Sequence, residues 1–151
     1  IVRSSGAEDV AVLHCTSLYP APPETLNLRI ILELEKKLDC PIGYSDHFDG
    51  KLASVAAVAV GAVIIEKHFT LDRTKAGEDH AISLEPSAFR EMVEDIRGVE
   101  KMLGSSEKIP HPIEVENRAA LHRRVTARRD IERGEVITEE DLLMMRLPPD
   151  I

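Results

Sequence analysis

LASVAAVAVGAVIIEKHFT, residues 52–70, places a helix pattern, a stop and a strand pattern in direct succession. Residues 52–60 are rich in Ala and Val and have no strongly polar face, as expected for a helix that packs against a sheet. Gly61 ends this helix, and residues 62–68, which open with four apolar residues, predict a strand. The stretch therefore predicts one unit of an α/β fold.

The same order of elements recurs on both sides of this stretch. Residues 10–15 and 40–44 are two further short apolar runs, and each predicts a strand. Residues 24–38 and 85–103 predict helices with one apolar face, and Gly104 stops the second of them. The chain thus holds three strand-helix units of a parallel α/β fold, which are too few to close an eight-unit barrel.

The character of the sequence changes after Gly104. Residues 105–120 contain two prolines and predict a linker, and residues 121–151 predict the start of a small β-rich domain. This part is strand-like at residues 124–127, 136–137 and 143–146, with a capped turn at 138–142. Such a domain is too short to close a core alone, and the chain begins without an initiator Met. We therefore expect a fragment of a longer protein.

The composition is that of an ordinary soluble globular protein, with 43% hydrophobic and 30% charged residues among 151. A net charge of −8 argues against a general nucleic-acid binder, and the one basic cluster, residues 118–133, is interspersed with Asp and Glu, which favours a solvated surface. The longest apolar run, residues 53–65, is shorter than the about 20 residues that cross a bilayer. Cys15 and Cys40 are interpreted as free thiols rather than a disulfide, and no signal peptide opens the chain. These features predict a cytoplasmic protein without nucleic-acid or membrane partners.

Polar residues gather where each predicted strand ends, at residues 14–19, 45–47 and 66–70. In a parallel α/β barrel the carboxyl ends of the strands line the active site. Polar groups at three successive strand ends lower the stability of the core unless they are used. The pattern therefore predicts a functional site at this edge of the sheet.

His47 and His68 each close a strand, so their imidazoles are expected to enter one cleft. Imidazole and oxygen ligands suit Mn²⁺, Zn²⁺ or Fe²⁺, whereas the alternative is two histidines hydrogen-bonded to the backbone. Ser17 and Ser45 are hydroxyl donors of the kind that binds phosphate, or simple turn residues. Asp79, in a long polar loop, binds sugar hydroxyls or is merely solvated.

Five stretches together resemble the sialic acid (N-acetylneuraminate) synthase family. Four of them belong to the strand-helix part: LHCTSLYPAPPETLNLR (13–29), PIGYSDH (41–47), AAVAVGAVIIEKHFTLDRTKAGEDHAISLEP (56–86) and VEKMLG (99–104), which ends the long helix. The fifth, RRDIERGEVITEEDL (128–142), resembles the opening of the SAF, or antifreeze-like, domain of that family. The resemblance implies that residues 1–104 are the last three units of a (β/α)8 TIM barrel and that residues 121–151 begin the SAF domain.

The resemblance also implies an activity. Members of the family condense phosphoenolpyruvate with water and an N-acetylmannosamine-type amino sugar, and they release phosphate and a nine-carbon 2-keto acid. His47 and His68 match the two protein ligands of a divalent metal in the catalytic centre. Mn²⁺ is the favoured ion, with Mg²⁺ or Co²⁺ as alternatives.

Further positions match substrate contacts of the family. Ser45 matches a contact to the phosphate of phosphoenolpyruvate, and Ser17 stands at a second phosphate position where other members carry Asn. Tyr19 and Asp79 match positions that hold the amino sugar. Residues 146–150 depart from the family's Arg-Pro-Gly run, so the resemblance does not predict the path of the next loop of the small domain.

The resemblance implies a homodimer in which the small domain of one subunit caps the barrel of the other. We expect the 151 residues alone to be inactive, because the remaining active-site residues of the family lie outside them. Two alternatives stay open. The first is a non-catalytic module that binds a carbohydrate or a protein partner. The second, within the enzyme class, is a precursor sugar of legionaminic or pseudaminic acid as the substrate.

Overall fold

A computed structural model describes residues 2–7, 9–77 and 79–147 of the chain. The chain divides into two compact units, residues 1–104 and residues 105–151. The elements of the first unit are, in chain order, η1 (Arg3–Ser5), β1 (Val12–Cys15), η2 (Pro23–Thr25), α1 (Ile30–Lys37), β2 (Ile42–Asp46), α2 (Leu52–Ala59), β3 (Ile64–Lys67), η3 (His80–Ile82) and α3 (Pro86–Leu103).

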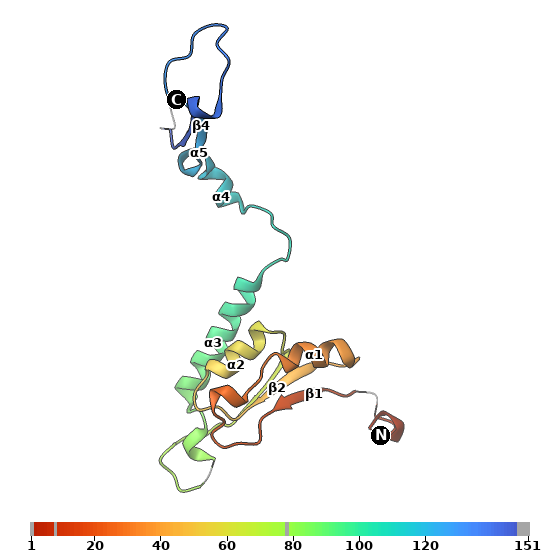
Figure 1. The fold of residues 1–151 in the computed structure, drawn as a ribbon. Helices are drawn as coiled ribbons and strands as arrows, with labels where there is room; N and C mark the ends of the chain where they lie inside the picture. The colour runs from red at the N-terminus through yellow and green to blue at the C-terminus, as the bar shows by residue number, and fades with distance from the viewer. Residues whose placement is uncertain (1, 8, 78, 148–151) are drawn as a thin grey trace. The chain divides into compact units, whose positions relative to one another are not determined.

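A parallel sheet with strand order β1-β2-β3 forms the centre of the first unit. Its register aligns Cys15 with Ser45 and Ser45 with Glu66. Figure 1 shows α1, α2 and α3 on one side of this sheet. The α/β fold predicted from the alternation of apolar strands and amphipathic helices is therefore confirmed.

The helix-covered face of the sheet carries the hydrophobic core. Ile42 and Tyr44 of β2 are buried against Ile31 of α1 and against Ala53 and Ala57 of α2. Small alanine side chains let α2 lie close to the sheet, which explains why this helix lacks a strongly polar face. A second cluster joins α3 to α2 and β3, and its buried members are Leu84, Met92 and Ile96.

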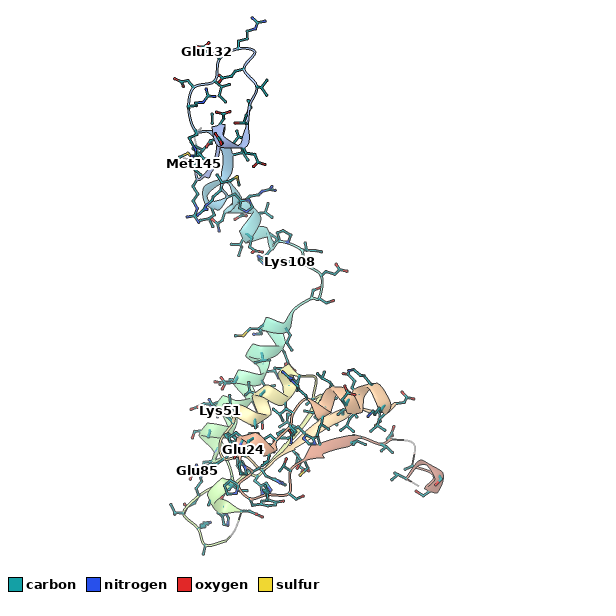
Figure 2. All side chains as sticks on the ribbon, viewed as in Figure 1. Glu24, Lys51, Glu85, Lys108, Glu132 and Met145 are labelled. Carbon is teal, nitrogen blue, oxygen red and sulfur yellow. The ribbon has the colours of Figure 1, made fainter. Side chains whose placement is uncertain are left out.

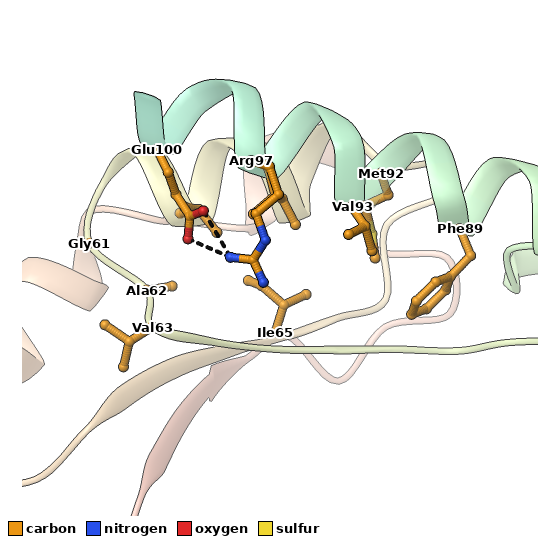
Figure 3. A pocket seen from close by; sticks show the side chains of 11 residues that line it. Gly61, Ala62, Val63, Ile65, Phe89, Met92, Val93, Arg97 and Glu100 are labelled. Carbon is orange, nitrogen blue, oxygen red and sulfur yellow. Dashed lines mark hydrogen bonds and ion pairs between the residues drawn. The ribbon is translucent and has the colours of Figure 1, made fainter. Parts of the chain in front are cut away.

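α3 is also fixed to α2 by charge. Lys51, labelled in Figure 2, lies 2.9 Å from the carboxylates of both Glu91 and Asp95. Between α3 and β3 the surface is hollowed into a mainly apolar groove, which Figure 3 shows with Phe89 and Val93 on the helix side and Val63 on the other. Val63, which directly precedes β3, is 71% exposed, so part of this apolar surface is open to solvent.

The middle strand of the sheet, β2, contains a glycine that no other residue can replace without a steric clash. Gly43 lies between Leu13 of β1 and Ile64 of β3 in the register. A Cβ atom at Gly43 would lie 2.7 Å from the carbonyl oxygen of Ile64 and 3.0 Å from Cγ of Leu13. The backbone therefore has room for no side chain at this position.

The predicted element bounds hold closely for all three strands and for α2 and α3, and they fail at α1. The helix expected over residues 24–38 begins at Ile30. Asn27 has a φ of +44°, in the left-handed region, which interrupts a right-handed helix. Pro23–Thr25 forms a separate 3₁₀ turn, η2, before this interruption.

The second unit contains α4 (Pro112–Glu116), α5 (Arg118–Leu121), β4 (Arg124–Ala127), η4 (Glu139–Asp141) and β5 (Leu142–Met145). β4 and β5 pair in antiparallel fashion. α4 lies in the stretch expected to be a linker, and α5 lies there except for its last residue, Leu121. The strand-like segment expected at residues 136–137 lies outside both strands. The capped turn is confirmed, since Asp141 accepts hydrogen bonds from the backbone and hydroxyl of Thr138. Of the divergent residues 146–150, the last three lie outside the described part.

Within the described residues, no helix combines the length and the apolar character that a bilayer crossing requires.

Tyr44 gives a pH-dependent prediction. Its side chain is fully buried, and among the described residues its hydroxyl has no hydrogen-bond partner. Burial, with a smaller effect of Asp46, raises the pKa of Tyr44 above that of an ordinary tyrosine. The neutral side chain of Tyr44 therefore contributes fully to stability below about pH 10, and this contribution is lost as the pH rises further. We expect Tyr44→Phe to raise the free energy of unfolding by up to about 1 kcal/mol at pH 7 and to weaken its decline above pH 10.

Urea titrations of the full-length parent protein at pH 7, 9 and 11 check both effects. A Tyr44→Phe variant that is less stable than the wild type at every pH would contradict this prediction.

Candidate metal and substrate site

The candidate residues meet where the three strands end. Ser45 and His47 are two positions apart on one chain segment, and Glu66 and His68 are two positions apart on the next. Because side chains alternate between the faces of a strand, these four share the face opposite to the helices. The register, which pairs Ser45 with Glu66, brings the two segments side by side.

His47 is held in place by its neighbours. It is 6% exposed, and its Nδ1 lies 2.8 Å from the carbonyl oxygen of Thr16. The ring of Tyr19 stacks on it, with centroids 4.1 Å apart, and Sγ of Cys15 lies 3.7 Å from Nδ1. A neutral His47 that donates from Nδ1 to the Thr16 carbonyl carries its free lone pair on Nε2.

His68 faces the same small cluster of rings. Its centroid lies 5.2 Å from that of His47 in an edge-on arrangement, and 5.7 Å from that of Tyr19. Its Nδ1 lies 3.8 Å from Oδ2 of Asp79. The structure thus brings His47, His68, Tyr19 and Asp79 into one cluster, and the sequence had predicted that the two histidines would face one cleft.

The geometry of the two imidazoles fits a shared metal ion. With metal–nitrogen bonds of about 2.1 Å, two imidazoles bound to one ion at roughly 90–110° place their centroids about 4.5–5.3 Å apart. The observed separation of 5.2 Å lies within this range. Histidine ligands also commonly donate their other ring nitrogen to a carbonyl, as His47 does toward Thr16. Among the described residues no group of three or more His, Cys, Asp or Glu is placed so that it could hold a metal ion.

The two candidate serines differ in their surroundings. Oγ of Ser45 donates a hydrogen bond to Oε1 of Glu66 at 2.5 Å, on the same face as the histidines. Ser17 lies exposed in the loop after β1, two residues before Tyr19, and makes no hydrogen bond to the other candidate residues. Glu66 was not singled out from the sequence, although its spacing of two residues from His68 on a strand was the signal that would have found it.

The loop that carries Asp79 is tied down at several points. Arg73 contacts Oδ1 of Asp49 at 2.7 Å and donates from Nε to the carbonyl of Ala81 at 3.0 Å. Its backbone N–H donates to Glu85, labelled in Figure 2. These contacts tie Arg73 to the loop that follows β2 and to Ala81, two residues after Asp79, whose carboxylate lies near His68.

On the helix side of the same strand ends lies a buried ion pair that the sequence analysis did not identify. Nζ of Lys67 is 3.3 Å from Oδ2 of Asp46, and the two side chains are 1% and 0% exposed. Ser54 of α2 donates to the same carboxylate at 2.5 Å. Desolvation lowers the pKa of Lys67, and the charge of Asp46 opposes that change.

The chain is similar to known proteins over most of its length. The sequence profile of the NeuB family matches residues 1–108. The N,N'-diacetyllegionaminic acid synthase of Legionella pneumophila is 42% identical over 143 residues, which are 95% of this chain and 40% of that protein. The human N-acetylneuraminate-9-phosphate synthase is 47% identical over 131 residues, 86% of this chain and 36% of that protein.

A solved structure shares the fold. The crystal structure of the N-acetylneuraminic acid (sialic acid) synthetase of Leptospira borgpetersenii, in complex with citrate, superposes with a TM-score of 0.65 at 42% identity. The match covers 74% of this chain and 40% of that one. The chain thus spans less than half of the length of these relatives. Since the family profile covers well over half of the chain and these relatives are named synthases, the chain belongs to the NeuB family.

Proposed function

We propose that the full-length parent of this chain condenses phosphoenolpyruvate with an N-acetylmannosamine-type amino sugar and water, giving a nine-carbon 2-keto acid and phosphate. The observation that carries the proposal is the pair His47 and His68, with rings 5.2 Å apart at adjacent strand ends and Asp79 beside one of them. The relatives' names, which describe synthases of sialic acid and of a legionaminic acid derivative, support the same reaction class.

In this proposal His47 and His68 hold a divalent metal ion, with Mn²⁺ favoured over Mg²⁺ or Co²⁺. When bound, the ion supplies Lewis-acid polarisation of the sugar aldehyde. The Thr16 carbonyl keeps the proton of His47 on Nδ1, so that Nε2 is free to bind the ion. The ring of Tyr19, stacked on His47, shields one side of the imidazole from water.

The remaining candidate residues bind the substrates. Asp79 is 64% exposed at its side chain, so its carboxylate is free to accept hydrogen bonds from sugar hydroxyls. Ser45 donates to Glu66 in this structure and would rotate toward a phosphate oxygen of phosphoenolpyruvate. Ser17 adds a hydroxyl on the neighbouring loop. Each contact orients a substrate group relative to the two histidines.

The proposal extends to the architecture of the parent. Residues 1–104 would supply the last three units of a (β/α)8 barrel, and residues 121–151 would open an SAF domain that caps the barrel of a second subunit. The parent would work in the cytoplasm, where the free thiols of Cys15 and Cys40 stay reduced. The 151 residues alone would lack turnover, because a barrel active site draws residues from several strands.

Phosphate release by the full-length parent tests the proposal directly. The protein is given phosphoenolpyruvate and Mn²⁺ with N-acetylmannosamine, or with a precursor sugar of legionaminic or pseudaminic acid. Release of phosphate with one sugar, and none with phosphoenolpyruvate alone, supports the synthase and identifies its substrate. If no sugar elicits phosphate from folded, metal-loaded protein, a non-catalytic carbohydrate-binding module becomes the better description.

Asp79→Asn is expected to raise the KM for the amino sugar about 10-fold or more in the parent, because hydrogen bonds to a charged group contribute about 1.5–3 kcal/mol. The KM for phosphoenolpyruvate should stay within about twofold, since Asp79 faces His68 rather than the phosphate-type residue Ser45. Initial rates with each substrate varied in turn check this difference. Asp95→Asn, which alters another exposed carboxylate of the first unit, is the matched control. Equal changes in both KM values would contradict the assignment.

A further inference from the structure

The buried pair of Asp46 and Lys67 links the two strand ends that carry the histidines. Asp46 and Lys67 are direct partners in the register of β2 and β3. Each immediately precedes one of the histidines in sequence, Asp46 before His47 and Lys67 before His68. The ion pair therefore fixes the relative position of the two backbone segments from which both imidazoles project.

The same two side chains also hold the backbone beyond His47. Oδ1 of Asp46 accepts a hydrogen bond from the N–H of Phe48 at 2.8 Å. The ammonium group of Lys67 donates to the carbonyl of Phe48. His47 is thus held from both sides, by Asp46 before it and by Phe48 after it, whose N–H and carbonyl are both hydrogen-bonded. Ser54 of α2 anchors the arrangement to the helix layer through Oδ2 of Asp46.

Stability alone does not account for such a pair. Removing two charges from water is unfavourable, and apolar side chains of similar volume often give equal or greater stability at a buried site. An apolar pair could fill the space between the sheet and α2, but it could not hold the N–H and the carbonyl of Phe48. What the charged pair adds is a fixed direction for the segment that carries His47.

The pair lies on the opposite face from the substrate site. Alternation along the strands places Asp46 and Lys67 toward α2, where Ser54 donates to Asp46, and places His47 and His68 on the other face. With side chains that are 0% and 1% exposed, neither group is available to a substrate. Any effect of these residues on chemistry must therefore act through the histidines.

We propose that the buried Asp46–Lys67 pair is a positioning device that sets the spacing and direction of His47 and His68 for a single metal ion. The inference rests on the proposed metal site and adds to it two residues that touch neither metal nor substrate. Metal sites tolerate only small displacements of their ligands, and residues that orient ligands typically change metal affinity about 10–100-fold when replaced.

The test measures the binding of Mn²⁺ alone to the full-length parent, by electron paramagnetic resonance of the free ion, without substrates or turnover. The central variant is the double replacement Asp46→Asn with Lys67→Met, which removes both charges and nearly preserves volume. We expect the double variant to unfold at a temperature close to that of the wild type but to bind Mn²⁺ about 10–100-fold more weakly. Lys51→Met, which breaks an ion pair between α2 and α3 instead, is the matched control and should leave the affinity within about twofold.

A folded double variant with the Mn²⁺ affinity of the wild type overturns the positioning role and leaves the metal site itself in place. A wild-type parent that binds no Mn²⁺, or binds it equally after His47→Ala, overturns the metal site and this inference together. Ser54→Ala provides a milder variant if the double replacement does not fold. It frees only one oxygen of Asp46 in a helix already rich in alanine, and it should weaken Mn²⁺ binding by about 3-fold; unchanged affinity would count against the proposal.

Discussion

Alanine in place of His47 or His68 is expected to lower the kcat/KM for phosphate release by the full-length parent by about 10³-fold or more. A bound metal ion contributes several kcal/mol of charge stabilisation, and about 4 kcal/mol corresponds to three orders of magnitude in rate. If the two imidazoles share one ion, as proposed, removing either leaves that ion a single histidine ligand from this pair. Initial rates at saturating phosphoenolpyruvate and Mn²⁺, with the sugar varied, give the comparison.

Two further variants separate metal binding from a purely structural role of the histidines. His47→Asn keeps a side chain that can donate to the Thr16 carbonyl but lacks an imidazole lone pair. If the hydrogen bond to Thr16 is all that His47 provides, the asparagine variant should recover most of the activity that alanine removes. We expect it to stay as inactive as His47→Ala. His122→Ala, in the second unit, controls for loss of a histidine elsewhere and should retain the wild-type rate.

Gly43→Ala is expected to lower the free energy of unfolding of the parent by about 1–3 kcal/mol, the range found for overfilled cores. The added methyl group would lie 2.7 Å from the carbonyl oxygen of Ile64 and 2.8 Å from its Cβ, and the backbone oxygen moves only if β3 moves with it. A shift of β3 also displaces His68, so weaker Mn²⁺ binding should accompany the loss of stability. Urea titrations followed by far-ultraviolet circular dichroism give the first quantity.

Gly98→Ala is the matched control for this substitution. Gly98 lies inside α3, and a Cβ atom there meets no other atom within 4 Å. Alanine in the interior of a helix is favoured over glycine by about 0.5–1 kcal/mol, so Gly98→Ala should stabilise the protein. Equal stability of the Gly43→Ala variant and the wild type would show that β2 and β3 can separate without penalty, contrary to the packing described here.

Local pattern was enough to predict most of the first unit. In the stretch from α2 to β3, the helix, its end at Gly61 and the strand each follow from residues that are close together in sequence. The start of α1 was wrong because Asn27 adopts a left-handed conformation that composition does not reveal. α4 was missed because its proline, which is typical of linkers, also suits the first position of a helix.

The candidate site, too, could be predicted only where short-range pattern or a general rule of the fold was enough. That His47 and His68 would meet followed from one rule, that parallel strands end at the same edge. The bond from Ser45 to Glu66 and the pair of Asp46 with Lys67 depend instead on which strands are neighbours and in which register. Register is a property of the assembled sheet, so a single sequence read along its length did not disclose these contacts.

The outer strands of the sheet affect how readily the isolated 151 residues aggregate. Within the described residues β1 and β3 each pair with β2 alone, and the edge of β3 runs beside the apolar groove seen in Figure 3. Unpaired strand edges beside apolar surface promote aggregation. A preparation of these 151 residues is therefore expected to show concentration-dependent light scattering and to bind an environment-sensitive dye such as ANS. We would then expect the 151 residues to give a lower yield and to aggregate more readily than their parent, and these differences would be seen before any difference in catalysis.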